Sequence, residues 1–242
     1  MNKNAALRQK GGFMGNVRAY TPDCKKQIIR YKGAPVLSVN MKYPVFEELS
    51  DNKNEKIFVN KVNRFYSQTC ENYIRECSGG YSSKAASLYK KNGGVMTSLV
   101  LNFQVAYSDE NYISVFVDVS AFDGKKVQIR RFSQLWSAEK NAVLPASKIF
   151  DTGFKAKRYV KELICSIAEK NSKRKDFTYF DNYKSIINSK FDFSNFYFVP
   201  SGAAFFFDGG MLSASMPDVC VFVIPFESLR DIIKLPLFLK NN

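Results

Sequence analysis

The stretch TSLVLNFQVAYSDENYISVFVDVSAFDGKKVQIRRF, residues 97–132, predicts a set of consecutive antiparallel strands. It contains three runs rich in β-branched and aromatic residues, which strands favour, at 97–107, 112–121 and 125–132. Ser108–Asn111 reads as one turn, and Asp123-Gly124 is a strong signal for a hairpin turn. We therefore expect an antiparallel β-meander at the centre of the chain.

Alternation inside this stretch predicts which side chains share a face, because successive strand residues point to opposite sides. In the middle strand one face carries Ile113, Val115, Val117 and Val119. The opposite face carries Tyr112, Ser114, Phe116, Asp118 and Ser120. In the third strand Val127, Ile129 and Arg131 share a face. We expect one side of the sheet to be core and the other to be partly wet.

The segment before the meander predicts one strand and two helices. They are an extended run at 34–46, a wide apolar helical stripe at 54–77 and a weaker helical segment at 82–92. Pro35 and Pro44 bracket the strand and favour an edge position. Asn52 is placed to cap the first helix, and Gly79-Gly80 is expected to end it.

The segment after the meander predicts a loop and then two helices. The loop is SQLWS, 133–137, which holds the only tryptophan. The first helix, 154–170, places four apolar side chains on one face: Tyr159, Leu163, Ile164 and Ile167. Its other face carries a basic patch of Lys155, Lys157, Arg158 and Lys161. The second helix is short and covers 179–189.

The stretch FYFVPSGAAFFFD, 196–208, predicts a hairpin that turns at Ser201-Gly202. Alternation places Phe205 and Phe206 on opposite faces of its second strand, so both faces of that strand carry Phe. We therefore expect a central strand that is covered on both sides. A further strand at 218–226 and a final helix at 226–234 follow.

The order of these elements predicts an α+β fold with mainly antiparallel sheets, packed by about four to five helices. Three parts are expected along the chain: a basic flexible arm at 1–33, a small strand-helix unit at 34–95 and an α+β unit at 96–242. The two folded units are expected to pack together. At 242 residues the chain is long enough to bury a sizeable core without disulfides or metals.

The net charge is +14, and residues 1–33 carry half of it. Such a charge suits contact with nucleic acid, anionic lipid or an acidic protein, or it serves only to keep the protein in solution. The five cysteines lack CxxC spacing and have an odd count, so we expect free thiols in a reducing compartment. The chain as it stands shows no signal peptide, which favours the cytoplasm; a missing N-terminal segment would make it extracellular or envelope-facing.

The absence of histidine excludes the commonest catalytic designs. Without it there is no Ser-His-Asp or Cys-His mechanism and no histidine ligand for a metal. No compact nucleotide-binding or nucleophile-elbow motif is present either. We expect no catalytic residues, no cofactor and no metal, although an enzyme that uses carboxylates remains an alternative.

Four segments together resemble the extracellular region of RsiV-type anti-sigma factors. They are VLSVNMKYPVF with the following helix, the hairpin of 98–129, the helix at 154–170, and the ending from FYFVPSGAAFFFD through VCVFVIPFESLRDII. In that family a small PdaC-type domain precedes a larger domain of unknown function. The resemblance implies a bacterial origin and a non-catalytic protein that binds a protein or cell-envelope ligand.

Two departures limit what the resemblance carries over. The central hairpin reads YISVFVDVSAF where the family has a Gly-Gly-Ala-His segment, and the loop before the last strand reads GGMLSASM instead of being aromatic and acidic. Lysozyme sensing is therefore not transferred. That loop is still the expected partner-binding surface, through Gly209, Gly210, Met211, Leu212, Ser213, Ser215 and Met216. The alternative is non-specific or single-stranded nucleic-acid binding through the basic residues, by a monomer or a homodimer.

Overall fold

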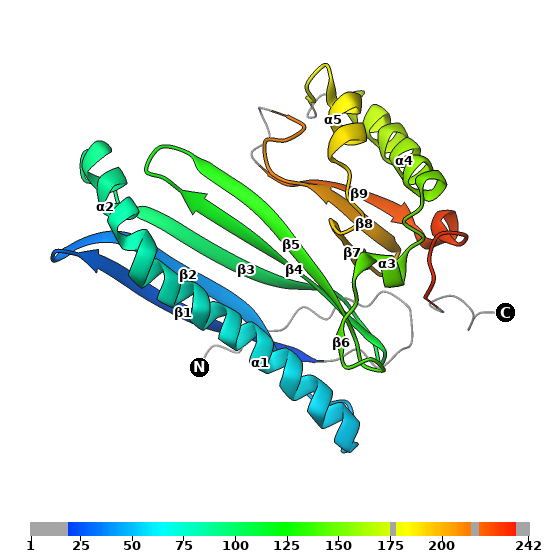
Figure 1. Ribbon diagram of the computed structural model, residues 1–242, viewed down its shortest axis with the longest axis horizontal. Helices are drawn as coiled ribbons and strands as arrows, with labels where there is room; N and C mark the ends of the chain where they lie inside the picture. Colours follow the sequence, from blue (N-terminus) through cyan, green and yellow to red (C-terminus); the bar gives the residue numbers. More distant parts are fainter. Residues whose placement is uncertain (1–18, 175–177, 214–217, 236–242) are drawn as a thin grey trace, which may run out of the picture.

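The computed structural model describes residues 19–174, 178–213 and 218–235, which form an α+β fold built on two sheets (Figure 1). The six-stranded sheet has the order β1-β2-β3-β4-β5-β6, and the three-stranded sheet has the order β7-β8-β9. The strands of the large sheet are β1 (Tyr20–Tyr31), β2 (Ala34–Phe46), β3 (Thr97–Ser108), β4 (Tyr112–Phe122), β5 (Val127–Ser137) and β6 (Ala142–Val143). Those of the small sheet are β7 (Phe196–Val199), β8 (Gly202–Phe207) and β9 (Cys220–Pro225). Neighbouring strands pair antiparallel except β2 and β3, which are parallel.

Helices cover the outer face of each sheet and leave the inner faces toward one another (Figure 1). The helices of the large sheet are α1 (Lys53–Glu76) and α2 (Ser82–Lys91), joined by the π-helical turn η1 (Cys77–Tyr81). Those near the small sheet are α3 (Ala146–Ile149), α4 (Phe154–Ser172) and α5 (Tyr183–Lys190). The chain thus connects β2 to the parallel β3 through α1 and α2, as a parallel pair requires.

Three apolar clusters hold these layers together. One lies between α1 and the large sheet and includes Tyr66, Met41 and Leu101. A second lies between the small sheet and α4. The third is smaller and joins the two sheets through Phe116, Tyr197, Ala204 and Phe206.

The prediction for β8 is confirmed. Every residue of this strand is buried, and it lies between β7 and β9. Phe205 is in the cluster below α4, while Phe206 is in the cluster between the sheets. The two faces of the strand therefore contact different layers, which is why both carry Phe.

The prediction of a flexible arm over 1–33 is wrong for its second half. Residues 20–31 form β1, which pairs with β2 along its whole length; residues 1–18 lie outside the described part of the chain. Polar residues hide this strand from sequence reading, because at the edge of the sheet most of its side chains are exposed. In addition, the pairing of β2 with β3 carries one sheet across the expected boundary at residue 95.

The edge position expected for 34–46 is also wrong, because β2 lies between β1 and β3. The ladder with β3 covers only Leu37–Lys42, so neither Pro35 nor Pro44 has to donate to it. Toward β1, Pro44 lies opposite Pro22. The hydrogen bond from Glu47 N to Ala19 O three positions away makes this a non-hydrogen-bonded pair, which accepts two prolines.

Four further expectations are corrected. Gly79-Gly80 does not end the helix, because both residues continue it through η1 without positive φ. Trp136 is in β5 and only 3% exposed, not in a loop. The buried stripe of α4 is Ala156, Val160, Ile164 and Ala168, and Tyr159 is exposed. The final helix is only the 3-10 turn η2 (Phe226–Leu229).

Candidate functional site

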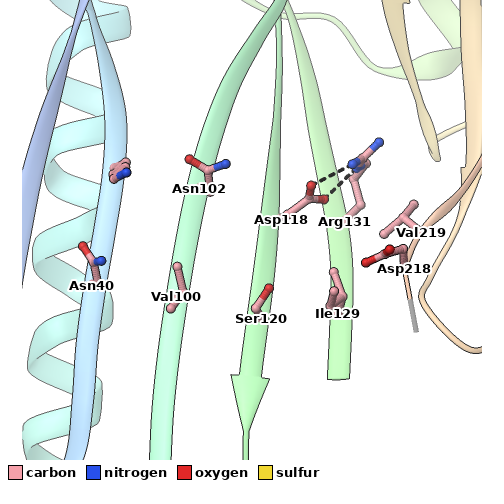
Figure 2. Close-up of a pocket in the computed structure, with 10 residues that line it drawn as sticks. Asn40, Val100, Asn102, Asp118, Ser120, Ile129, Arg131, Asp218 and Val219 are labelled. Atoms are coloured by element: carbon pink, nitrogen blue, oxygen red, sulfur yellow. Dashed lines mark hydrogen bonds and ion pairs between the residues drawn. The ribbon is translucent and has the colours of Figure 1, made fainter. Parts of the chain in front are cut away.

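A groove of about 570 Å³ lies on the face of the large sheet that α1 does not cover (Figure 2). Its floor crosses four strands, from β2 through β3 and β4 to β5, and its far wall is the segment that leads into β9. The polar side chains that line it are Asn40, Lys42, Asn102, Asp118, Ser120, Arg131 and Asp218. Val100, Ile129 and Val219 lie between them.

The groove exists because the small sheet covers only part of this face. At one end of β4, Ser114 is fully buried and Phe116 is 9% exposed beneath β7 and β8. Farther along the same face, Asp118 and Ser120 are only half-buried. Alternation along β4 therefore produces apolar contact at one end and an open polar surface at the other.

Arg131 forms the rigid wall between the part of this face that the small sheet covers and the open groove. Its Nε and Nη2 each lie 2.7 Å from one oxygen of Asp118, which is a bidentate ion pair. Its Nη1 donates to Tyr197 Oη at 3.1 Å, and the guanidinium lies 4.0 Å from the ring centre of Phe116. The Arg131 side chain is 10% exposed, so its positive charge mainly contacts groups of the protein itself.

The floor of the groove, in contrast, offers polar groups that the protein itself leaves available. Among the described residues, none donates to or accepts from the side chains of Lys42, Asn102 and Ser120. Asn40 Oδ1 accepts a single weak contact from Cys24 Sγ at 3.3 Å. An amide, a hydroxyl and an ammonium on one wall-bounded surface can bind the polar backbone of a ligand.

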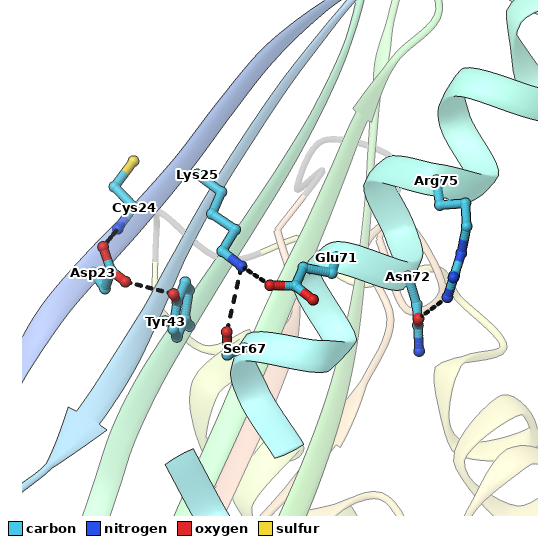
Figure 3. A network of polar contacts seen from close by, with 8 residues as sticks. All are labelled: Asp23, Cys24, Lys25, Tyr43, Ser67, Glu71, Asn72 and Arg75. Atoms are coloured by element: carbon cyan, nitrogen blue, oxygen red, sulfur yellow. Dashed lines mark hydrogen bonds and ion pairs between the residues drawn. The ribbon is translucent and has the colours of Figure 1, made fainter. Parts of the chain in front are cut away.

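A second polar cluster lies on the α1 side of the sheet and ties β1 to that helix (Figure 3). Lys25 Nζ lies 2.6 Å from Glu71 Oε1 and 3.3 Å from Ser67 Oγ. Tyr43 Oη donates to Asp23 at 2.5 Å, and this bond lowers the pKa of Asp23. Burial and the same bond raise the pKa of Tyr43 to about 12. Since the Lys25 ammonium is paired with Glu71, it has no lone pair to activate Ser67, and the cluster anchors the edge strand.

The expected binding loop borders the groove but is largely structural in its first half. Gly209 N donates to Ile129 O at 2.9 Å, and Asp208 accepts from Arg131 N, so this segment closes the free edge of β5. Met211 is half-buried, Leu212 is fully buried and Ser213 Oγ donates to Thr178 O. Gly210, with φ +75°, is exposed. Ser215 and Met216 lie outside the described residues, whereas Asp218, just beyond them, lines the groove.

The expected basic patch lies elsewhere, on α4 beyond the small sheet (Figure 1). Lys155, Lys157 and Arg158 are exposed and Lys161 is half-buried. Arg158 pairs with Glu162 at 3.1 Å. The structure therefore does not bring this patch and the loop together in one site.

Sequence reasoning missed the groove floor because alternation marks a wet face without saying where it is hollowed.

All five cysteine thiols are unpaired. Within the described ranges, no group of three or more His, Cys, Asp or Glu side chains is placed to hold a metal ion. No helix of the described part is long and apolar enough to cross a membrane.

The fold is similar to that of two solved proteins. No family model and no curated protein matches the sequence. A member of the DUF3298 family from Bacteroides fragilis aligns over 91% of this chain and 95% of its own, with a TM-score of 0.64 and 12% identity. A DUF3298 family protein from Pseudomonas aeruginosa aligns over 93% of this chain and 98% of its own, with a TM-score of 0.56 and 11% identity. The chain thus shares the fold of DUF3298 proteins, and its assignment to RsiV-type and PdaC-type units stays a prediction.

Proposed function

We propose that the chain is a non-catalytic binding protein and that its groove holds an extended peptide segment of a protein or a cell-envelope molecule. The observation that carries the proposal is the open polar floor beside the rigid Arg131–Asp118 wall. The resemblance to the sensing region of RsiV-type proteins agrees with such a role.

The dimensions and lining of the groove support a peptide as the ligand. From β2 to β5 the floor spans three strand spacings, or about 14 Å, which matches roughly four residues of extended chain. Asn40, Asn102 and Ser120 can bond backbone groups, while Val100 and Ile129 can contact side chains. No aromatic ring is among the described residues that line the groove, so there is no platform on which a sugar could stack.

The ionisable groups of the groove favour binding over catalysis. Asp118 and Asp218 are its carboxylates. A pair of carboxylates can work as acid and base only if both groups can reach the substrate. Both carboxylate oxygens of Asp118 are held at 2.7 Å by the guanidinium of Arg131, so this residue is poorly placed to act on a ligand. The proposal is therefore a binding site without chemistry.

The test is titration of the isotope-labelled chain with tetrapeptide mixtures and with purified peptidoglycan stem peptides, observed by NMR. We expect the side-chain amide signals of Asn40 and Asn102 to shift upon binding. Ser120→Trp should fill the floor and weaken binding at least tenfold. Ser83→Trp, on the exposed side of α2, is the matched control and should leave the affinity unchanged.

Two outcomes would argue against this function. If neither peptide set shifts the amides of Asn40 and Asn102 at millimolar concentration, the groove is not a peptide site. If a carboxylate-dependent hydrolysis of these peptides is found that Asp118→Asn abolishes, the protein is an enzyme and the non-catalytic assignment is wrong.

A further inference from the structure

Phe154, the first residue of α4, is the most exposed large apolar side chain among the described residues. The residue is 80% exposed, whereas the next, Tyr81, is 55% exposed. A soluble surface gains nothing from a whole phenyl ring in water, because burial of such a ring is strongly favourable. This position therefore raises the question of what the ring contacts.

The charged residues around Phe154 are basic except for Asp151, which is exposed and accepts from Gly153 N just before the helix. On a helix, residues at i+4 and i+7 lie on the same stripe, so Arg158 and Lys161 follow Phe154 along α4. Lys155 and Lys157 are exposed and flank that stripe on either side. The basic patch expected from sequence thus surrounds a protruding aromatic ring.

The acidic residues of this helix do not neutralise the patch. Residues 154–174 contain seven Lys and Arg but only Glu162 and Glu169 as acids. Glu162 is paired with Arg158, and Glu169 is paired with Lys184 of α5. Of the basic residues in the first two turns, Lys155 and Lys157 have no acidic partner within the described chain. The outward face of α4 is therefore strongly positive.

We propose that this face of α4 docks on an anionic lipid bilayer, with Phe154 entering the headgroup region and the surrounding Lys and Arg side chains contacting lipid phosphates. Basic residues gain free energy near a negatively charged leaflet, and an exposed aromatic ring prefers the interface between headgroups and acyl chains. Figure 1 places α4 on the outer side of the small sheet, whereas the residues that line the groove belong mainly to β2–β5 of the large sheet, so docking through α4 leaves the groove open.

The shape of the surface favours a bilayer over nucleic acid. Proteins that bind single strands without sequence preference use a concave basic groove with several aromatic rings for stacked bases. Here the convex outer helix carries one strongly exposed ring, Phe154, since the other exposed ring, Tyr159, is only 43% exposed, and the groove described above lies on another face. A flat anionic surface can contact the Phe154 ring and the basic side chains on both sides of it at the same time, so it is the partner that fits this face.

The experiment is co-sedimentation of the full chain with vesicles of phosphatidylcholine alone or with about one third phosphatidylglycerol. We expect binding only to the anionic vesicles, at low salt, and weakening as salt is raised. Phe154→Ser should lower the partition coefficient about tenfold. Tyr81→Ser removes an exposed aromatic ring from the far side of the molecule and should have no effect.

Two double variants with the same change in net charge test whether vesicle binding depends on this surface or only on the charge of the whole protein. Lys155→Gln with Lys157→Gln should weaken anionic-vesicle binding about tenfold, whereas Lys90→Gln with Lys91→Gln, at the end of α2, should not. Equal loss from both pairs, or no binding to anionic vesicles by the unaltered chain, would overturn the proposal. So would a change of oligomeric state in Phe154→Ser, or tight oligonucleotide binding that the α4 pair alone abolishes.

Discussion

At the scale of single residues, Arg131 is one of the side chains that join the two sheets. It pairs with Asp118, bonds Tyr197 and lies over Phe116. Arg131→Met should lower the free energy of unfolding by about 2–3 kcal/mol, because it leaves a half-buried carboxylate without its partner. Denaturant titration measures this loss.

The control is another arginine–carboxylate pair that lies in water. Arg158→Met breaks the exposed contact with Glu162 and should cost about 0.5 kcal/mol or less. If Arg131→Met costs no more than this control, the wall of the groove is not held by the ion pair. Adding Asp118→Asn to Arg131→Met should recover part of the loss, since the unpaired charge is then removed.

Buried Cys70 makes stability depend on alkaline pH. Burial raises the pKa of this thiol from near 9 to about 12. The folded state therefore holds a proton that the unfolded state releases above pH 9, and stability falls between pH 9 and 12. Cys70→Ala should flatten this fall by about 1.4 kcal/mol per pH unit. Parallel stability curves for the two proteins from pH 8 to 10.5 would contradict the assignment.

At this scale the sequence holds enough information to predict the Asp118–Arg131 pair of the groove wall, although we did not predict it. Alternation groups Asp118 with Ser120 on one face of β4 and Arg131 with Ile129 on one face of β5, and the register shows that these faces lie on the same side of the sheet. The turn at Asp123 sets the register, since Asp123 N bonds Lys126 O and counting back pairs Asp118 with Arg131. The cation–aromatic contact with Phe116 and Tyr197 could not be found, because Tyr197 comes from a distant hairpin.

At the scale of elements, two glycines show how local space decides the effect of one methyl group. A Cβ on Gly202, at the start of β8, would lie 2.1 Å from the backbone oxygen of Ile224 in β9. Gly202→Ala must push two paired strands apart and should cost more than about 2 kcal/mol. Gly79→Ala is the control: it lies in a helical turn with open space around it. That change should stabilise the chain by up to about 1 kcal/mol. Equal effects in thermal unfolding would refute the argument.

Helix α1 is joined to the end of β2 by the side chain of Asn63. Its Oδ1 accepts from Phe46 N at 2.8 Å, and its Nδ2 donates to Phe46 O at 2.9 Å, as a neighbouring strand would. Asn63→Ala leaves both backbone groups unpaired and should cost about 1–3 kcal/mol. Asn60→Ala, on the exposed side of the same helix, should cost about 0.5 kcal/mol or less. Amide exchange of Phe46 should accelerate only in the first variant.

Elements with strong periodic signals were predicted well, and elements defined by their neighbours were not. The strand at 34–46, the helix over 54–77 and the first two meander strands agree with the structure within a few residues, whereas the third continues five residues beyond its expected end at 132. Strand β1 was missed because an exposed edge strand needs no apolar alternation. The break at Gly79-Gly80 was wrong because a glycine pair can also continue a helix, here between Cys77 and Ala85, which are both buried in the core of the large sheet.

At the scale of the whole molecule, the α+β class follows from the order of the segments, but the stacking of the two sheets does not. This stacking depends on which polar side chains, expected from the sequence to contact water, instead meet across the interface between the sheets. Ser114 illustrates this: it is polar in sequence and fully buried, because its Oγ accepts from Phe198 N at 2.9 Å. The groove begins where the side chains of the two sheets no longer contact each other, so it could not be located from alternation alone.

This interface leads us to expect that the two sheets unfold as one cooperative unit. Native-state hydrogen exchange should give the amides of β4 and β8 the same opening free energy, because neither sheet can bury the inner faces of Phe116 and Phe206 alone. Ser114→Ala should lower both values together by about 1–2 kcal/mol, since it leaves Phe198 N unpaired in a buried site. Ser98→Ala, on the same face of the large sheet but outside the groove lining and the interface, should lower neither. A lower opening free energy for β8 that Ser114→Ala does not change would instead show two units that merely touch.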